Sequence, residues 1–524
     1  MGADDRLSGL HFSGAVFDLD GVVTLTATLH MAAWKRLFDE YLTGLAERSG
    51  KPFVPFDSGK DYILYVDGKP RYKGVQSFLE SRGIHLKCGD PSDSPETETI
   101  CGLGNRKDRY FRRLVEEKGV EIDESMLSFI HKLKDRGVEV GVASSSKNCV
   151  PILKRTGIED IFEAVVDGVA AEERGLKGKP HPDIFLECAR LMDVDPSETM
   201  VVEDAISGVQ AGENGQFGLV VGIARGNTGS VLRENGADLV LSIPVDIDIR
   251  SIDMWFSNRE YRRPSALARW KELQAKLGRR SLVVFLDYDG TLTPIVSRPE
   301  LARIDENMRS VVRHLADVCP TAVVSGRGRE DVTGLIGLDN VYYAGSHGFD
   351  IQGPNGSHIQ YEVDPTLEPE MEEASRQLGA DVDGIEGVIV EDKRFSVAVH
   401  YRMAGEKNIS RVERAVDRVI TEHPRLRKAE GKKVFEVRPR IDWDKGKALL
   451  WLLEALGLAG SQLMPVYIGD DTTDEDAFRA IRESGIGVLV SEVPRPTEAT
   501  YSLQDTGEVA EFLTRLTSIA KDRN

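Results

Sequence analysis

The sequence contains one strand-and-acid pattern twice, and this duplication constrains the fold more than any other feature. In the first half, Ala15-Val16-Phe17 leads directly into Asp18-Leu19-Asp20-Gly21. In the second half, Leu282–Leu286 leads into Asp287-Tyr288-Asp289-Gly290. Strand-like segments alternate with helical ones in both halves, which is typical of parallel α/β sheets. We therefore expect an α/β protein with two Rossmann-like cores of related design.

Each half also contains a second strand that ends in two acids, Glu203-Asp204 and Asp470-Asp471. Residues i and i+2 of a strand point to the same side, and ligands of parallel sheets bind at the carboxyl ends of the strands. The acids of each half should therefore converge and repel one another unless a cation binds between them. Carboxylate oxygens favour a hard divalent cation, so we expect one Mg²⁺ per domain.

A serine and a lysine follow in the same order in both halves, Ser144 and Lys179 in the first and Ser325 and Lys445 in the second. Taken alone, such a serine is usually a helix cap, but together the two side chains can hold a phosphate. The ordered set favours phosphoryl transfer. One aspartate attacks phosphorus, a second protonates the leaving group and activates the incoming hydroxyl or water, and Mg²⁺ neutralises the phosphate charge.

The spacing of these motifs predicts the domain boundaries. The interval from Asp18 to Ser144 and the interval from Ser325 to Lys445 are much longer than one helix and one strand require. We expect a first domain over 10–245 with a mainly helical insertion at about 26–119. A second domain over 281–522 should carry an α+β insertion at about 350–437. The linker 246–280 should contain a helix between Pro264 and Gly278. Such insertions can act as lids that exclude water.

Composition excludes several other classes of protein. The 524 residues have a net charge of −19, which argues against a nucleic-acid partner. With 41% hydrophobic and 29% charged residues the chain is not globally disordered, and no apolar run approaches the roughly 18 residues of a membrane span. The first ten residues do not form a secretory signal, and the five cysteines are scattered. We expect a cytoplasmic protein without a membrane partner.

These motifs resemble those of the haloacid dehalogenase (HAD) superfamily, once per half. The resemblance implies that Asp18 and Asp287 are nucleophiles and that Asp20 and Asp289 are the general acid/base residues. The expected metal ligands are the acids at the strand ends, namely Asp18, Asp20, Glu203 and Asp204 in the first half and Asp287, Asp289, Asp470 and Asp471 in the second.

The second half is similar to the trehalose-6-phosphate phosphatase family over about 281–520. The similarity rests on Ser325-Gly326-Arg327, Gly345-Ser346-His347-Gly348, Glu436-Val437-Arg438 and Gly469-Asp470-Asp471 in that order. It implies binding of the disaccharide by Arg327, His347, Glu436 and Arg438. The alternatives are a simple tight turn at His347 and an exposed strand pair at Glu436 and Arg438. We interpret Asp474-Glu475-Asp476 as helix N-terminal charge rather than as metal ligands.

The first half resembles β-phosphoglucomutase and its sugar-phosphatase relatives, on Gly68-Lys69-Pro70-Arg71 and Ser144-Ser145-Ser146-Lys147-Asn148. A mutase binds two phosphates, and the resemblance implies that Arg71, assisted by Lys107 or a neighbour, holds the phosphate that does not react. His30 is expected to position Asp20. The first half is then a mutase or a phosphatase for a small sugar phosphate. A different sugar phosphate as substrate of the second half, or one catalytically silent, regulatory half, remain the alternatives.

Overall fold

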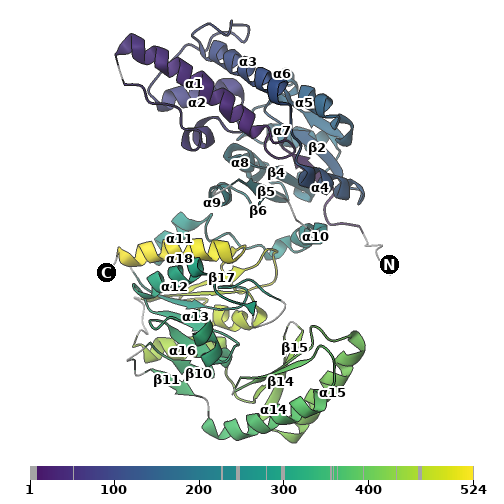
Figure 1. Cartoon of the computed structure of the whole chain (residues 1–524), viewed down its shortest axis with the longest axis vertical. Coiled ribbons are helices and arrows are strands. Elements are labelled where there is room, and N and C mark those ends of the chain that lie inside the picture. Colours follow the sequence, from purple (N-terminus) through teal and green to yellow (C-terminus); the bar gives the residue numbers. More distant parts are fainter. Residues whose placement is uncertain are drawn as a thin grey trace. The chain divides into compact units, whose positions relative to one another are not determined.

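The computed structural model describes residues 9–50, 52–225, 228–242, 248–278, 280–296, 301–354, 357, 359–362, 364–393, 395–431, 433–457 and 463–522. The chain forms two compact units, Met1–Arg262 and Arg263–Asn524 (Figure 1). The expected linker 246–280 is divided between them, because α10 (Ile249–Ser257) belongs to the first unit and α11 (Trp270–Leu277) to the second. Residues 243–247 lie outside the described part.

The first unit is built on a parallel sheet in the order β3-β2-β1-β4-β5-β6. Its strands are β1 (Gly14–Phe17), β2 (Glu139–Ala143), β3 (Ala164–Val166), β4 (Thr199–Glu203), β5 (Leu219–Ala224) and β6 (Leu239–Ser242). The connecting helices are α4 (Glu124–Lys134), α5 (Cys149–Thr156), α6 (Gly168–Glu173), α7 (Asp183–Leu191), α8 (Ile206–Asn214) and α9 (Gly229–Glu234). Because β2 and β4 flank β1, the segments carrying Ser144, Asp18 and Glu203 end side by side.

The insertion of the first unit is helical. It contains α1 (Ala27–Ser49), a short π-helical turn (Tyr62–Val66), α2 (Arg71–Ser81) and α3 (Ile100–Lys118). Figure 1 shows α1 beside α3, and these elements enclose a separate apolar cluster that includes Trp34, Phe38, Phe56 and Phe78. Four aromatic side chains that pack on one another make the insertion a small domain with its own core.

The second unit is built on a sheet in the order β11-β10-β9-β8-β7-β16-β17-β18. Its strands are β7 (Ser281–Leu286), β8 (Thr321–Val324), β9 (Tyr342–Gly345), β10 (Asp350–Gln352), β11 (Gln360–Glu362), β16 (Leu463–Gly469), β17 (Ile486–Val490) and β18 (Tyr501–Leu503). Alternation along β7 buries both faces: Leu282, Val284 and Leu286 pack in one core cluster, and Val283 and Phe285 in another.

Helices cover both faces of this sheet. One cluster includes residues of α11, α12 (Glu306–Ala316) and α18 (Thr506–Lys521), and the other includes residues of α16 (Lys445–Ala455) and α17 (Glu475–Ala480), while α13 (Arg329–Ile336) connects β8 to β9. Leu267, which precedes α11, and Leu273 and Leu277 of α11 are buried in the core of the second unit. The Trp270 ring packs edge-on against Phe512.

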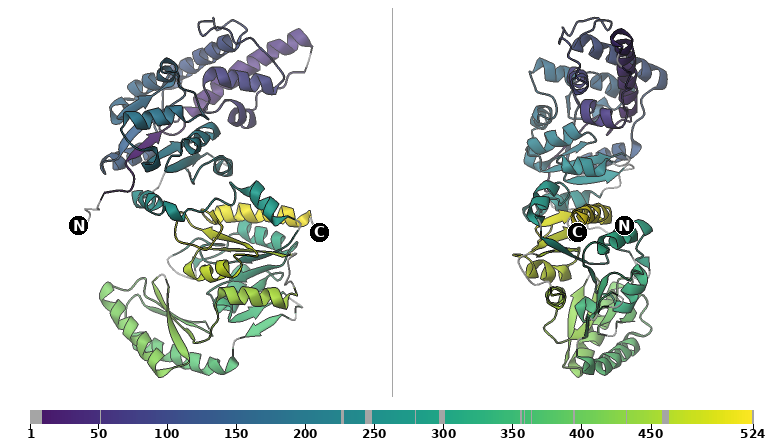
Figure 2. Two further views of the ribbon diagram at one scale, coloured as in Figure 1. Left: turned by 180° about the vertical axis from the view of Figure 1, so that it is seen from behind. Right: turned by 90° about the vertical axis from the view of Figure 1, so that its left-hand side faces the viewer.

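The insertion of the second unit has its own antiparallel sheet, in the order β12-β13-β15-β14. Its strands are β12 (Ile389–Asp392), β13 (Val397–His400), β14 (Leu426–Gly431) and β15 (Val434–Pro439). The helices α14 (Glu368–Val382) and α15 (Glu406–Glu422) cover one face, and the other face is turned towards the core of the same unit (Figure 2). Strands β10 and β11 pair with the core sheet, so the separate subdomain begins after Glu362 rather than at residue 350. Among the described residues we find no helix with the length and apolarity that crossing a membrane requires.

Candidate functional site

The candidate site of the second unit begins at the turn that follows β7. The Asp287 backbone N–H donates to the Ile468 carbonyl of β16 at 2.9 Å, which continues the pairing of these strands into the turn. Gly290 has a φ of 80°, and a Cβ atom there would lie 2.2 Å from Asp470 Oδ2. Only glycine fits this position, and its small size lets the Asp470 carboxylate approach the D-x-D-G turn.

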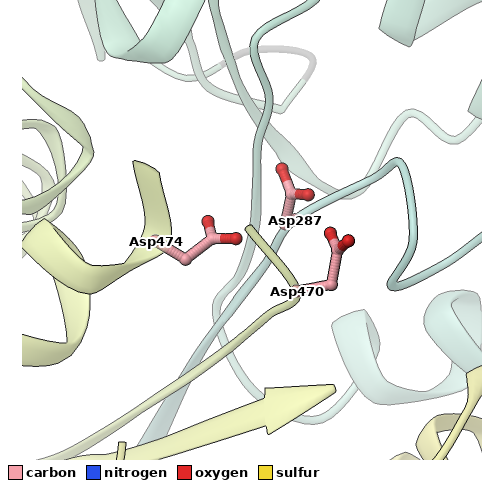
Figure 3. Close-up of side chains that lie close together, drawn as sticks. All are labelled: Asp287, Asp470 and Asp474. Atoms are coloured by element: carbon pink, nitrogen blue, oxygen red, sulfur yellow. The ribbon is translucent and has the colours of Figure 1, made fainter. Parts of the chain in front are cut away.

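Three buried carboxylates meet at this point. Oxygen atoms of Asp287, Asp470 and Asp474 all lie within 4.8 Å of one another (Figure 3). Burial, together with Asp474 and Asp470, raises the pKa of Asp287 well above its usual range, although Lys445 lowers it. Such a set of oxygen donors fits a divalent cation such as Mg²⁺, which would neutralise the mutual repulsion.

Two of the four acids predicted as metal ligands of this unit, Asp287 and Asp470, belong to this group, and Asp474 is added to them. The Asp289 carboxylate pairs with Arg327 instead. The Asp471 carboxylate accepts a hydrogen bond from the Thr472 backbone N–H at 2.6 Å and caps a 3₁₀ turn, so it does not join the three carboxylates. Asp474 lies at the end of that turn, is fully buried, and accepts hydrogen bonds from the Tyr467 hydroxyl at 2.7 Å and the Asp471 N–H at 2.8 Å. From the sequence, Asp474 is not among the expected metal ligands.

Lys445 joins the acids from the first position of α16. Its Nζ is 2.8 Å from Asp287 Oδ1 and 2.6 Å from Asp474 Oδ1, and the side chain is buried. Burial alone would lower the pKa of this lysine, but the two carboxylates raise it above the usual value. Lys445 is therefore an ammonium cation placed beside the carboxylate predicted to attack phosphorus.

Ser325 and Arg327 come from the loop after β8. Ser325 is buried, and its hydroxyl accepts a hydrogen bond from the Arg327 N–H at 3.2 Å. The Arg327 guanidinium binds both oxygens of Asp289 at 2.7 Å and also reaches Asp331 at 3.1 Å. Asp289 is 45% exposed, in contrast to buried Asp287. The two aspartates of the motif therefore have different environments, as different roles require.

A second group of side chains joins the core to the insertion. His347 follows β9 with a φ of 59°, a left-handed conformation that is uncommon for a non-glycine residue. Its Nε2 lies 2.5 Å from Arg438 Nη2 and 3.3 Å from Glu436 Oε2, both on β15. Burial and Arg438 lower the pKa of His347 to about 4, so the ring is neutral near pH 7.

Lys393 is a member of this group that the sequence analysis missed. Its Nζ lies 3.6 Å from Glu436 and 3.7 Å from Glu391, and the side chain is only 8% exposed. Burial would raise the pKa of Glu436, but Lys393 and His347 hold it well below its usual range. The insertion thus presents the buried, ionised Glu436 carboxylate between Lys393 and Arg438, facing His347 of the core.

The first unit repeats the arrangement of lysine and acids. Lys179 Nζ donates to both Asp18 and Glu203, and all three side chains are buried. Glu203 also accepts from the Ala205 N–H at 2.6 Å. Lys179, Asp18 and Glu203 therefore correspond in their contacts to Lys445, Asp287 and Asp474, although Glu203 is the last residue of its strand and Asp474 follows a turn.

Asp204 is the further acid at this centre. A Cβ atom on Gly21, whose φ is 97°, would lie 1.9 Å from Asp204 Oδ2, which parallels Gly290 and Asp470. Arg225 Nε donates to the same oxygen at 3.3 Å. The structure also adds Asp67 of the insertion, whose pKa burial and Glu203 raise to about 7. Within the described part of the chain, the acids of the first unit do not form a group as close as the three of the second.

Asp20 lies in a polar cavity between the core and the insertion. It accepts hydrogen bonds from Thr26 at 2.5 Å and from Ser144 at 3.4 Å, and it lies 3.2 Å from His30 Nε2. Lys107 Nζ is 2.6 Å from the other nitrogen of His30. Burial would raise the pKa of Asp20, but His30 and its hydrogen bonds lower it to about 2. The structure thus brings His30 and Lys107 to the predicted acid/base residue.

Arg71 also lines this cavity, from the first position of α2. Its Nη1 lies 3.1 Å from Asp108 of α3. The side chains predicted for the first unit therefore gather around one cavity and the buried acids at its base, but the cation assigned to a second phosphate already has a partner within the chain.

Comparisons with known proteins agree with this division. A family model described as trehalose-phosphatase matches residues 285–507, and one described as haloacid dehalogenase-like hydrolase matches residues 12–216. The chain is 38% identical over 512 residues to an uncharacterized glycosyl hydrolase of Mycobacterium tuberculosis; the match covers 97% of this chain but only 38% of that protein. The chain therefore spans well under half the length of that relative.

The chain is also similar to two proteins whose names state an enzyme activity. The trehalose-phosphate phosphatase of Mycobacterium leprae is 36% identical over 408 residues, which cover 75% of this chain and 92% of that protein. A solved structure of beta-phosphoglucomutase from Clostridium difficile aligns with 48% of this chain and 100% of its own chain, at 26% identity and a TM-score of 0.38. The expected HAD and phosphatase resemblances are confirmed: the chain belongs to the trehalose-phosphate phosphatase family and carries a second HAD-like hydrolase domain in its first half.

Proposed function

We propose that the second unit hydrolyses trehalose 6-phosphate to trehalose and phosphate in a Mg²⁺-dependent reaction. The observation that carries the proposal is the buried group of Asp287, Asp470 and Asp474 with Lys445 beside it, in a chain of the trehalose-phosphate phosphatase family. The acids provide a cation site and the lysine provides a phosphate contact, so a nucleophilic carboxylate and its anionic substrate can coexist.

In this proposal each side chain has a distinct task. Asp287 attacks phosphorus in line, while Lys445 and the Ser325 hydroxyl bind the phosphate oxygens. Asp289 protonates the leaving sugar oxygen and then takes a proton from the attacking water. Asp287, Asp470 and Asp474 would hold Mg²⁺, which supplies charge neutralisation at the transferring phosphate.

The position of Asp289 agrees with a role in proton transfer. Its partial exposure leaves it accessible to a leaving group and to water, and the two hydrogen bonds from Arg327 orient its carboxyl group. The guanidinium can then also face a phosphate or a sugar hydroxyl, because Arg327 has further donors.

The sugar is proposed to bind between the core and the insertion. His347 is neutral and its Nε2 accepts from Arg438, so Nδ1 carries the proton and can donate a hydrogen bond to a hydroxyl. Glu436, Arg438 and Lys393 supply charged partners for further hydroxyls from the opposite side. A disaccharide has enough hydroxyl groups to contact both sides, which supports trehalose 6-phosphate over a smaller substrate.

For the first unit we propose phosphoryl transfer at Asp18 on a small sugar phosphate, by a β-phosphoglucomutase-like or a phosphatase reaction. The buried contacts of Lys179 with Asp18 and Glu203, and of His30 with Asp20, support an active site rather than a silent domain. Asp18, Glu203 and Asp204 would hold the Mg²⁺ of this unit. A purely regulatory domain would not need these side chains in this order. We propose that both units act on small sugar phosphates in the cytoplasm.

Phosphate release from trehalose 6-phosphate by the full chain tests the assignment of the second unit. Asp287→Asn should lower the rate by at least about 1,000-fold, because the nucleophile is lost, whereas Asp18→Asn should leave it within about twofold. Glucose 6-phosphate, tested in the Asp18→Asn chain so that the first unit cannot hydrolyse it, serves as a second substrate that lacks the outer sugar ring. Equal rates with both compounds would favour another sugar phosphate, and loss of activity in Asp18→Asn alone would overturn the assignment.

A further inference from the structure

A carboxylate of the chain occupies the end of the first-unit cavity that faces Arg71. Asp108 lies on α3, and its Oδ2 is 3.1 Å from Arg71 Nη1 and 3.0 Å from Arg112 Nε. Its Oδ1 accepts a hydrogen bond from Asn148 Nδ2 at 2.8 Å. Arg71 comes from α2 of the insertion and Asn148 from the loop after β2, so Asp108 is bound from two sides. A guanidinium and an amide converging on anionic oxygens are the usual partners of a phosphate.

This end of the cavity belongs to the same site as the reacting groups. The cavity is lined by Asp18, Asp20, Arg71, Asp108 and Asn148 among others. Asp108 is ionised, because Arg71, Asn148 and Arg112 lower its pKa although burial would raise it. The Arg71 guanidinium is already paired with the Asp108 carboxylate. A second phosphate would therefore have to displace Asp108 in order to bind Arg71.

We propose that Asp108 determines the substrate class of the first unit: the end of the cavity at Arg71 takes an uncharged, hydroxyl-bearing group, so the unit acts on sugar monophosphates in preference to bisphosphates. This inference rests on the proposed phosphoryl transfer at Asp18. An ionised carboxylate accepts hydrogen bonds from hydroxyl groups readily, whereas it repels a phosphate dianion.

The same placement favours hydrolysis over a mutase reaction. In a mutase, a hydroxyl of the incoming sugar monophosphate must face the phosphorylated aspartate, Asp18. The phosphate of that sugar must then bind at the other end of the cavity, where Asp108 lies. Hydrolysis needs only one phosphate. An oxygen of Asp18 bonds to phosphorus as the ester P–O bond breaks, and the leaving oxygen takes the proton of the monoanionic sugar phosphate, which the Asp20 carboxylate relays. Water then attacks the phosphorus, gives a proton to Asp20, and releases phosphate with Asp18 restored.

The contact between Asp108 and Asn148 also ties the insertion to the core, so the test must separate specificity from structure. Binding is measured by calorimetry with Mg²⁺ on the full chain that carries Asp18→Asn to prevent turnover. The two probes are glucose 1,6-bisphosphate and glucose 6-phosphate. Asp108→Asn keeps the size of the side chain and a hydrogen-bond acceptor, and Asp108→Ala serves as a second variant. Thermal unfolding shows whether each variant is folded.

Asp108→Asn should bind the bisphosphate at least about tenfold more tightly, since Arg71 becomes available, and should change affinity for the monophosphate by less than about threefold. Adding Arg71→Gln should remove the gain. An unchanged ratio of the two affinities in a folded variant would overturn the assignment of Asp108. Sites in the second unit bind equally in all variants, so they do not alter this comparison.

Failure of the underlying function gives a different result. The Asp287→Asn chain should still release phosphate from glucose 6-phosphate or a similar sugar monophosphate, and adding Asp18→Asn should abolish that release. If phosphate release depends on Asp18 while Asp108→Asn leaves the ratio of the two affinities unchanged, only the specificity inference is wrong. If neither probe binds and nothing is released, phosphoryl transfer by the first unit is wrong and the inference fails with it.

Discussion

Replacing Asp474 by asparagine tests the part of the metal site that only the structure shows. The Asp474 carboxylate accepts three hydrogen bonds, from Lys445 at 2.6 Å, the Tyr467 hydroxyl at 2.7 Å and the Asp471 N–H at 2.8 Å, and it is fully buried. The substituted amide would have one acceptor oxygen and no charge, so Lys445 would lose one of its two carboxylate partners.

The expected loss can be estimated from these contacts. Breaking a buried ion pair costs about 3–5 kcal/mol, and the remaining amide oxygen recovers part of it, so we expect the second unit to lose about 2–3 kcal/mol in its free energy of unfolding. Removing one of three carboxylates near the cation should weaken Mg²⁺ binding by about 10–100-fold. Affinity is measured by calorimetry with Mg²⁺ and independently from the Mg²⁺ dependence of phosphate release.

Asp471→Asn provides a matched control three residues away. Asp471 caps a turn and does not reach the other carboxylates, so the same substitution should cost at most about 1 kcal/mol of stability and change Mg²⁺ affinity by less than about threefold. A larger loss of Mg²⁺ affinity in Asp471→Asn than in Asp474→Asn would refute the assignment of the acids.

Three further substitutions in the second unit have defined outcomes. Gly290→Ala places a Cβ atom 2.2 Å from Asp470 Oδ2 at a positive φ, so Mg²⁺ affinity measured by calorimetry should fall by at least about tenfold, and an unchanged affinity would contradict the close approach. Arg327→Lys removes the two-pronged contact with Asp289, so kcat should fall by about 10–100-fold in the phosphate-release assay; an unchanged kcat would argue against this role. The folded pKa of His347, about 4, is below its unfolded value, so the unfolded state binds more protons between about pH 4 and 6.5 and stability falls as pH decreases through that window. Urea unfolding of His347→Asn should show a smaller decrease there, by up to about 3 kcal/mol, and an identical pH profile would contradict the buried neutral ring.

The sequence was sufficient where a motif lies directly at the end of a strand. Asp18, Asp287, Ser144 and Ser325 follow buried apolar strands, and parallel pairing of β1 with β2 and of β7 with β8 leaves them little freedom. The repeated order of the motifs then predicted two α/β cores with insertions at different places. Lys179 and Lys445 reach the acids as the order implied.

Where a turn intervenes, the sequence was not sufficient. Asp470-Asp471 resembles Glu203-Asp204, but the chain after β16 enters a 3₁₀ turn that directs Asp471 to a backbone N–H and Asp474 to Lys445. The pattern of two adjacent acids does not show which side chain the turn directs inwards. Hydrogen-bond geometry decides this, and it appears only in the folded chain.

Residues of the insertions were the hardest to predict. Lys393 and Asp108 have charged neighbours in sequence, and Asp67 follows the apolar run Tyr62–Val66, so no local pattern marks them as site residues. Their burial depends on the packing of the insertion against the core of the same unit. The start of the second insertion was placed too early for a similar reason, since β10 and β11 are short and pair with the core sheet.

The identity of the nucleophile is the central claim, and peptide mapping of the phosphorylated enzyme tests it most directly. The full chain is mixed with trehalose 6-phosphate and Mg²⁺, quenched in acid within one turnover, and digested for mass spectrometry. The account predicts that the phosphoryl group is on Asp287 and that Asp287→Asn carries none. Phosphate on Asp18 instead, or rapid turnover without any phosphorylated aspartate, would contradict it.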